Sequence, residues 1–190
     1  MAKPGKQLDP VKTRESIMRA ALKLFADRGP DGASIADIAQ AAKVPKSLIQ
    51  YHFGTKEQLW NACLERLAAP MILAIDHMLA SGKPDLPQLM ATRFKFMRDN
   101  PEVRRLIGWA SLGNIPAPQF IVEKREQLMD SFVGDLKRPQ LARLLFVLSA
   151  TDGWFHFRNM YRSVVGDQIL SDEVEREFLE ILLEVAPKFE

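Results

Sequence analysis

Apolar residues recur every three or four positions along most of this chain, and glycine or proline interrupts the pattern at helix-sized intervals. Near the N-terminus Ile17, Ala21 and Leu24 follow the helical period, and near the C-terminus Val174 and Phe178 begin a similar stripe. Alternating β-branched runs, which would indicate strands, are absent. The pattern predicts an all-α protein of about nine helices, at 10–28, 34–41, 45–52, 55–81, 85–99, 101–113, 117–133, 138–165 and 171–187.

Several helix ends carry their own signals. Gly29 follows the first helix, where glycine adopts the left-handed conformation without a Cβ clash. Ser171 precedes two acidic residues and predicts an N-cap. Pro70 falls inside the helix expected at 55–81, which it should kink or split.

Composition narrows the class of protein. The chain has 190 residues, 47% of them apolar and 26% charged, which are globular values and exclude a disordered chain. A single cysteine, Cys63, excludes an internal disulfide framework and a Cys-based zinc site. The longest apolar run, Ala68–Ile75, is far shorter than the ~20 residues that span a bilayer, and no secretory signal is visible. We expect a soluble cytoplasmic protein.

Charge is divided unevenly along the chain. Residues 1–66 carry 11 Lys and Arg against 7 Asp and Glu, a net charge of +4, while the rest carries −2. A basic N-terminal third suggests a polyanion as partner. Lys3, Lys6 and Lys12 are candidates for a minor-groove arm, and a solvated tail is the alternative.

The segment 34–56 holds the most informative pattern. Ser34 and Asp37 have the spacing of an N-cap with its partner, Pro45 ends one short helix and starts another, and Thr55 with Gln58 forms a capping box. Two short helices joined by a tight turn predict a helix-turn-helix motif.

The chemistry of the second short helix fits duplex DNA. Lys46 and Lys56 can neutralise phosphates, Gln50 can contact adenine and Ser47 can bond several base edges. Such a helix spans only about 10 Å and reads a few base pairs, so useful affinity needs a dimer on a two-fold site.

Further residues complete a recognisable pattern: Ala21-Leu22-Lys23-Leu24-Phe25, Gly29, Ser34-Ile35-Ala36-Asp37-Ile38-Ala39, Ala42, Val44, Tyr51-His52-Phe53, Lys56 and Leu59. Through them residues 17–60 resemble the DNA-binding domain of the TetR family of bacterial transcriptional repressors. Lys43 stands where that family often has Gly, Pro45 where a Ser or Thr cap is common, and Gln50 where Tyr is usual.

The resemblance implies an all-α homodimer that binds palindromic operators and a small effector. It implies a DNA-binding domain at 1–54 and an effector-binding and dimerisation domain at 55–190. It places these residues in recognition elements or at phosphates: Ser34, Lys46, Ser47, Leu48, Gln50, Tyr51, His52 and Lys56. Packing between helices is the alternative for Tyr51, and local support is the alternative for His52.

The C-terminal body offers an effector site and a dimer interface. Candidate contacts for an apolar or amphipathic effector are Phe94, Met97, Trp109, Asp152, Phe155 and His156. Most aromatic residues here must form core, and Asp152 needs a partner: Arg158, another arginine, a second subunit or a ligand. Small residues on the helix at 138–165 allow another helix to approach closely. Together with the last helix they could form a four-helix dimer interface, which is the arrangement that the resemblance implies, and an intramolecular contact is the alternative. The candidate interface residues are Ser149, Ala150, Gly153, Phe157, Phe178 and Leu182.

Motifs for enzyme chemistry are missing from the sequence. It contains no phosphate-binding glycine loop, no H-E-x-x-H and no G-x-S-x-G. We therefore expect a regulator that is not an enzyme and needs no cofactor or metal. The alternatives are an all-α small-molecule binding protein or enzyme without sequence-specific DNA binding, and a non-specific nucleic-acid protein, against which the modest +4 argues.

Overall fold

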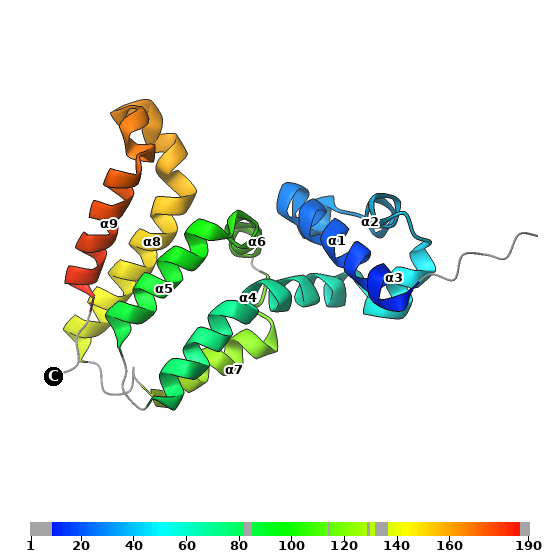
Figure 1. Cartoon of the computed structure of the whole chain (residues 1–190), viewed down its shortest axis with the longest axis horizontal. Helices are drawn as coiled ribbons and strands as arrows, with labels where there is room; N and C mark the ends of the chain where they lie inside the picture. Colours follow the sequence, from blue (N-terminus) through cyan, green and yellow to red (C-terminus); the bar gives the residue numbers. More distant parts are fainter. Residues whose placement is uncertain (1–8, 82–84, 114, 129, 132–136, 187–190) are drawn as a thin grey trace, which may run out of the picture. The chain divides into compact units, whose positions relative to one another are not determined.

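The computed structural model describes residues 9–81, 85–113, 115–128, 130–131 and 137–186. Within these ranges every regular element is helical and no strand occurs, which confirms the all-α prediction. The elements are α1 Pro10–Gly32, α2 Ile35–Ala42, α3 Lys46–Phe53, α4 Lys56–Ala80, α5 Leu86–Asp99, α6 Pro101–Leu112, α7 Gln119–Leu128, α8 Arg138–Val165, the 3-10 turn η2 Asp167–Leu170 and α9 Asp172–Val185 (Figure 1).

The chain divides into two compact units. The first comprises Met1–Leu67 and Arg105–Pro116, and the second comprises Ala68–Arg104 and Ala117–Glu190. Helices α4 and α6 therefore each contribute residues to both units. Pro70 lies within α4, which is continuous, so this proline does not split the helix.

The core of the first unit is built from the apolar faces of α1 to α4. Its fully buried side chains include Ile17, Ala21, Phe25, Ile38, Ile49, Leu59 and Cys63. Phe25 packs edge to face on Trp60, with ring centroids 5.3 Å apart. Burial raises the pKa of the Cys63 thiol to about 12, which makes the thiol unreactive.

Helix α1 is interrupted at its C-terminal end. Asp9 caps its start by accepting the backbone N–H of Val11 at 3.0 Å. Gly29 has φ 71° and ψ 172°, which breaks the helix, and Pro30–Gly32 forms a further turn. The regular helix thus ends where the sequence predicts.

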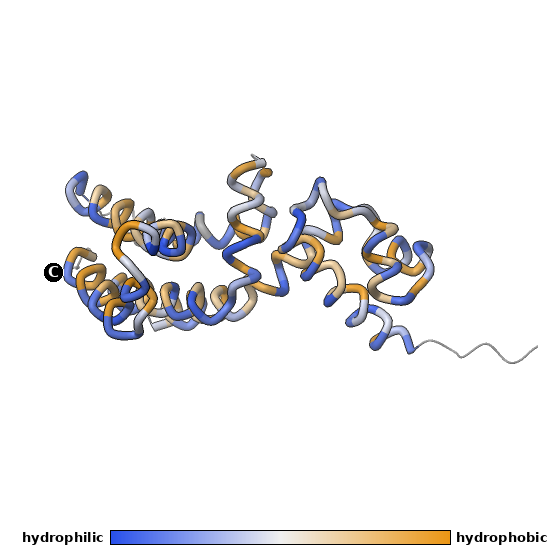
Figure 2. The backbone as a smooth tube through the Cα atoms, turned by 90° about the horizontal axis from the view of Figure 1, so that it is seen from above, coloured by the Kyte–Doolittle hydropathy of each residue, from blue (hydrophilic) through white to orange (hydrophobic). Residues whose placement is uncertain are grey.

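Helices α5, α8 and α9 supply the core of the second unit. Trp154 stacks on Phe178 at 4.3 Å, and Phe94 lies 4.9 Å from Phe155. Figure 2 shows how apolar and polar residues alternate around the turns of the helices. Ser171 caps α9 by accepting the N–H of Val174 at 3.3 Å, as predicted.

Candidate nucleic-acid interface

Helix α2 begins at a capping box. Ser34 Oγ accepts the backbone N–H of Asp37 at 3.1 Å, and Asp37 Oδ2 accepts the backbone N–H of Ser34 at 3.2 Å. The Ser34 hydroxyl also donates to Asp37 Oδ2 at 2.6 Å. These hydrogen bonds, the hydroxyl's first and then the backbone's, hold the pKa of the Asp37 carboxyl below its usual value. The predicted cap is confirmed, and it fixes where the motif starts.

The turn between α2 and α3 is held by backbone hydrogen bonds and by one contact from α1. Lys43 has φ 57° and ψ 43°, a left-handed conformation, and the N–H of Val44 donates to the Ala39 carbonyl at 3.0 Å. Ser16 on α1 donates its hydroxyl to the Ala42 carbonyl at 3.1 Å. This contact ties the turn to the first helix.

Helix α3 has one face in the core and the other in solvent. Ile49 is fully buried and Phe53 is 9% exposed. The exposed candidates are Lys46, Ser47, Gln50 and Tyr51, and the half-buried ones are Leu48 and His52. Tyr51 is 81% exposed, so packing between helices is not its role within this unit. The solvent face therefore presents a cation, a hydroxyl, an amide and an aromatic ring together.

Helix α4 begins beside this face at a second capping box, which the sequence also predicts. The N–H of Thr55 donates to Gln58 Oε1 at 2.8 Å, and the N–H of Gln58 donates to Thr55 Oγ1 at 3.1 Å. Lys56 follows directly and is half-buried, while Ser34 is exposed.

Arg14 is a basic residue near this surface that the sequence analysis missed. Its guanidinium carbon lies 4.9 Å from the centroid of the Phe53 ring, and the residue is exposed. The sequence does place Arg14 near the start of the first helix, whose apolar face packs on the helix-turn-helix motif, and this position could have indicated a basic residue close to the DNA-binding surface. Lys12 is exposed and lies 3.8 Å from Asp9, while Lys3 and Lys6 fall outside the described residues.

The predicted dimer residues fall into two groups. Ser149 and Phe157 are exposed, and Ala150 and Gly153 are half-buried, all on one stripe of α8. Leu182 is 2% exposed, so it lies in the core of its own unit. Phe178 is half-buried against Trp154, as described above. The stripe continues through other exposed apolar side chains of α8: Phe146, Met160 and Val164.

The candidate effector residues belong to two different units. Phe94, Met97 and Phe155 are buried in the second unit. Trp109 belongs to the first unit, where its indole N–H donates to the Ala26 carbonyl at 3.2 Å. The predicted set therefore draws on both units, and its contact with an effector stays a prediction.

Asp152 finds the partner that its position requires. Arg93 on α5 donates to its carboxylate, with Arg93 Nη2 2.7 Å from Asp152 Oδ1. The other terminal nitrogen, Arg93 Nη1, is buried and has no hydrogen-bond partner among the described residues. His156 is exposed, and its Nδ1 lies 2.8 Å from the carbonyl of Asp152. Of the alternatives open for Asp152, an arginine elsewhere is the one observed.

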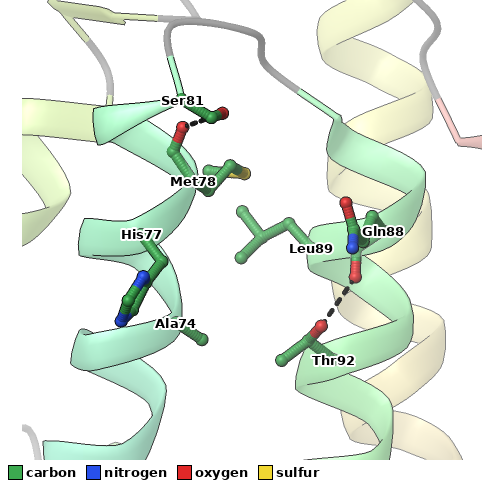
Figure 3. A pocket seen from close by; sticks show the side chains of 7 residues that line it. All are labelled: Ala74, His77, Met78, Ser81, Gln88, Leu89 and Thr92. Carbon is green, nitrogen blue, oxygen red and sulfur yellow. Dashed lines mark hydrogen bonds between the residues drawn. The ribbon is translucent and has the colours of Figure 1, made fainter.

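A cavity of about 330 Å³ lies between α4 and α5 in the second unit, and the sequence analysis did not find it. Figure 3 shows the side chains that line it: Ala74, His77, Met78, Ser81, Gln88, Leu89 and Thr92. The Thr92 hydroxyl donates to the Gln88 carbonyl at 2.9 Å. Polar and apolar groups are mixed in this lining, and none of the described residues that form it is an Asp, Glu, Lys or Arg.

The described part of the chain has neither a metal-binding cluster nor a membrane-spanning helix. No group of three or more His, Cys, Asp and Glu side chains that could hold a metal ion occurs there. None of the described helices is both long enough and apolar enough to cross a membrane.

Comparison with known proteins places these features in a family. Residues 17–63 match the model for bacterial regulatory proteins of the tetR family. An HTH-type transcriptional repressor of Mycobacterium tuberculosis, Rv3405c, is 32% identical over 169 residues, which cover 84% of this chain and 81% of the relative.

Solved structures agree on the fold. A putative transcriptional regulator of Streptomyces coelicolor, SCO4942, superposes with a TM-score of 0.66 at 24% identity, covering 93% of this chain and 99% of that one. A TetR family transcription regulator of Marinobacter aquaeolei superposes with a TM-score of 0.65 at 15% identity, covering 92% and 95%.

Proposed function

The chain belongs to the tetR family of bacterial regulatory proteins, and from this premise we propose that it binds a palindromic DNA operator as a homodimer and leaves it when a small effector binds. One observation supports DNA binding above the others. Helix α3 buries Ile49 and Phe53 while Lys46, Gln50 and Tyr51 remain exposed on one short, capped helix. The Tyr51 ring is 81% exposed and contacts the His52 ring edge-on, with the ring centroids 5.1 Å apart, which leaves most of its surface available, so we assign this ring to a partner.

Each side chain has a role that its chemistry allows. Lys46 and Lys56 contact phosphates, which position the protein without reading sequence. Gln50 reads adenine, Ser47 bonds a base edge and Leu48 meets a thymine methyl. Ser34, Tyr51 and His52 complete the set at the edges of the motif. In this proposal residues 1–54 form the DNA-binding domain and residues 55–190 carry the effector and dimer functions, with Lys56 at the start of α4 adding one phosphate contact from the second region.

The exposed stripe of α8 supports a homodimer. Phe146, Phe157 and Met160 are each about half exposed, at 55%, 49% and 57%. Large contiguous apolar surfaces on a protein mark contacts with partners. A second copy that covers this stripe would place two recognition helices on one two-fold operator, with half-sites about 34–36 Å apart.

The second unit supports an apolar or amphipathic effector. The cavity between α4 and α5 lies at the lower end of the range of about 300–1,000 Å³ typical of small-molecule sites. Its described lining residues, mixed apolar and polar and without an Asp, Glu, Lys or Arg, suit an apolar or amphipathic ligand. Arg93 Nη1 offers a further unpaired donor in the same unit, beside the predicted contact Asp152.

Selection of bound duplexes from a random DNA pool tests the proposal directly. Wild-type protein should enrich a palindrome, and Gln50→Ala should relax one position of each half-site at a cost of about 1–3 kcal/mol. Lys46→Gln should lower the salt dependence of binding by about 0.9 in log–log slope. Lys95→Gln, an exposed lysine of α5, is the matched control and should change neither.

The outcomes separate the remaining functions. Binding without a preferred site would indicate a non-specific nucleic-acid protein. Absence of DNA binding by folded protein, with or without metabolite extract, would favour the all-α binding protein or enzyme. The relatives named above are transcriptional regulators, which are not enzymes.

A further inference from the structure

The end of α1 carries a carbonyl that its own helix cannot satisfy. In a regular α-helix the carbonyl of Ala26 would accept the N–H of residue 30. Residue 30 is Pro30, which has no N–H, and Gly29 before it leaves the helical conformation. The Ala26 carbonyl therefore needs a donor from outside the helix or from water.

Trp109 on α6 supplies that donor. Its Nε1–H donates to the Ala26 carbonyl at 3.2 Å, across 83 residues of sequence. The indole lies against Gly29 so closely that a Cβ at this position would come within 2.9 Å of ring atoms Cδ2 and Cε3. Only glycine fits at position 29 without strain, because φ is positive there and because the indole leaves no space for a Cβ.

A second contact lies one helical turn earlier on α6. Arg105 Nη1 is 3.1 Å from Asp27 Oδ1. Both side chains are about half exposed, so this ion pair adds little energy by itself. It does fix which face of α6 lies on α1, because Arg105 and Trp109 are separated by four residues and share that face.

The segment held by these contacts leads directly into the DNA-binding motif. The N–H of Ala33 donates to the Gly29 carbonyl at 3.2 Å, and Ala33 is fully buried. Ser34, the cap of α2, follows. The conformation of residues 29–33 therefore sets where α2 begins relative to α1.

We propose that Trp109 is a positioning residue for DNA binding, which closes the end of α1 and thereby holds the helix-turn-helix in its binding geometry. This role is additional to the effector contact that the sequence predicts for Trp109, and it rests on the proposed DNA binding. Trp109 lies within Arg105–Pro116, the segment that belongs to the same compact unit as the N-terminal helices.

Substitutions of Trp109 in the full-length protein test this role. Trp109→Phe keeps an aromatic ring but removes the N–H, and Trp109→Ala removes the ring as well. The matched control is Trp154→Phe in the second unit, because the buried Nε1 of Trp154 has no hydrogen-bond partner among the described residues. Amide hydrogen exchange of the segment 26–34 and affinity for the selected operator are measured at a temperature where circular dichroism shows each variant folded.

Trp109→Phe should speed exchange in this segment by about threefold to tenfold, the range expected for one net hydrogen bond. It should weaken operator binding by a similar factor. Trp109→Ala should change both the exchange rate and the operator affinity by more, and Trp154→Phe should change neither. Unchanged exchange and affinity in Trp109→Phe would overturn the proposal, even if the variant melts earlier. A wild-type protein that selects no operator would instead refute the proposed function, and the exchange data would still decide whether Trp109 holds the turn.

Discussion

Lys43 provides the sharpest test of how this helix-turn-helix is built. Its φ of 57° and ψ of 43° lie in the left-handed region, and it is the one non-glycine residue with positive φ in the described part of the chain. An L-residue with a Cβ pays about 1–2 kcal/mol for this conformation. Glycine avoids that strain but loses about 0.5–1 kcal/mol through its greater freedom in the unfolded chain. Lys43→Gly should therefore stabilise the protein by about 0.5–1 kcal/mol.

Two further variants separate the backbone from the charge. Lys43→Ala removes the charge but keeps the Cβ, so its stability should stay close to that of the wild type. Lys43→Asn should fall between Gly and Ala, because asparagine tolerates the left-handed region better than most residues. Urea denaturation followed by circular dichroism measures all three. Equal stability of the Gly and Ala variants would refute the strain assigned to this turn.

The same variants report on DNA contact. Lys43 is exposed beside the start of α3, so its ammonium is available to a phosphate. If it makes that contact, Gly and Ala variants should both lower the salt slope of operator binding by about 0.9. A change in Lys43→Gly alone would show that the backbone geometry, not the charge, matters for binding.

The other predictions concern the dimer, the cavity and two titrating groups. Phe157→Glu should make the protein monomeric in analytical ultracentrifugation, whereas Leu73→Glu, at another exposed apolar position, should not; a dimer that survives Phe157→Glu removes α8 from the interface. Compounds that dissociate the wild-type protein from the selected duplex should no longer do so for Leu89→Trp, in which the larger side chain fills the cavity between α4 and α5. If the same compounds still dissociate this variant from DNA, the effector binds elsewhere. Cys63 should resist thiol reagents in the folded state because burial raises its pKa to about 12; rapid labelling of native protein would contradict that burial. The pKa of Asp37 is lowered in the folded protein, so the ionised carboxylate should contribute stability above its usual pKa of 3.8, and this contribution should be lost as the pH falls through the folded pKa. Acid unfolding of the wild type and of Asp37→Asn measures this loss. If the difference in stability between the two proteins does not change with pH, the ionised carboxylate contributes no stability.

Local signals in the sequence predicted the helix-turn-helix correctly. The capping boxes at Ser34 and Thr55 join residues three positions apart, so the sequence contains both partners of each hydrogen bond. The left-handed conformation of Lys43 was indicated by the family resemblance, because Lys43 stands where that family often has Gly. Helical periodicity predicted that Leu48 or Ile49 faces the core and that Gln50 is exposed, and the structure buries Ile49.

Local sequence signals could not predict contacts between residues that are far apart in the chain. The sequence required a partner for Asp152, but the choice of Arg93 depends on how α5 packs beside α8. The cavity at His77 and Leu89 arises where two helices fail to fill the space between them, and no residue pattern marks such a gap. Of the two effects expected of Pro70, a kink or a split, the split is excluded because α4 continues through this residue, and the kink stays a prediction.

Trp109 shows where reading the sequence could have gone further. From the sequence, Trp109 was predicted only as a candidate effector contact among the aromatic residues of the C-terminal part, and it was not connected with the end of the first helix. The sequence Gly29-Pro30 at the end of the first helix already implied that the Ala26 carbonyl has no helical donor. A glycine beside an orphan carbonyl also leaves space for a flat ring with one N–H, which only tryptophan provides among apolar side chains. The unsatisfied carbonyl could thus have predicted its tryptophan partner, although not which of Trp60, Trp109 and Trp154 it would be.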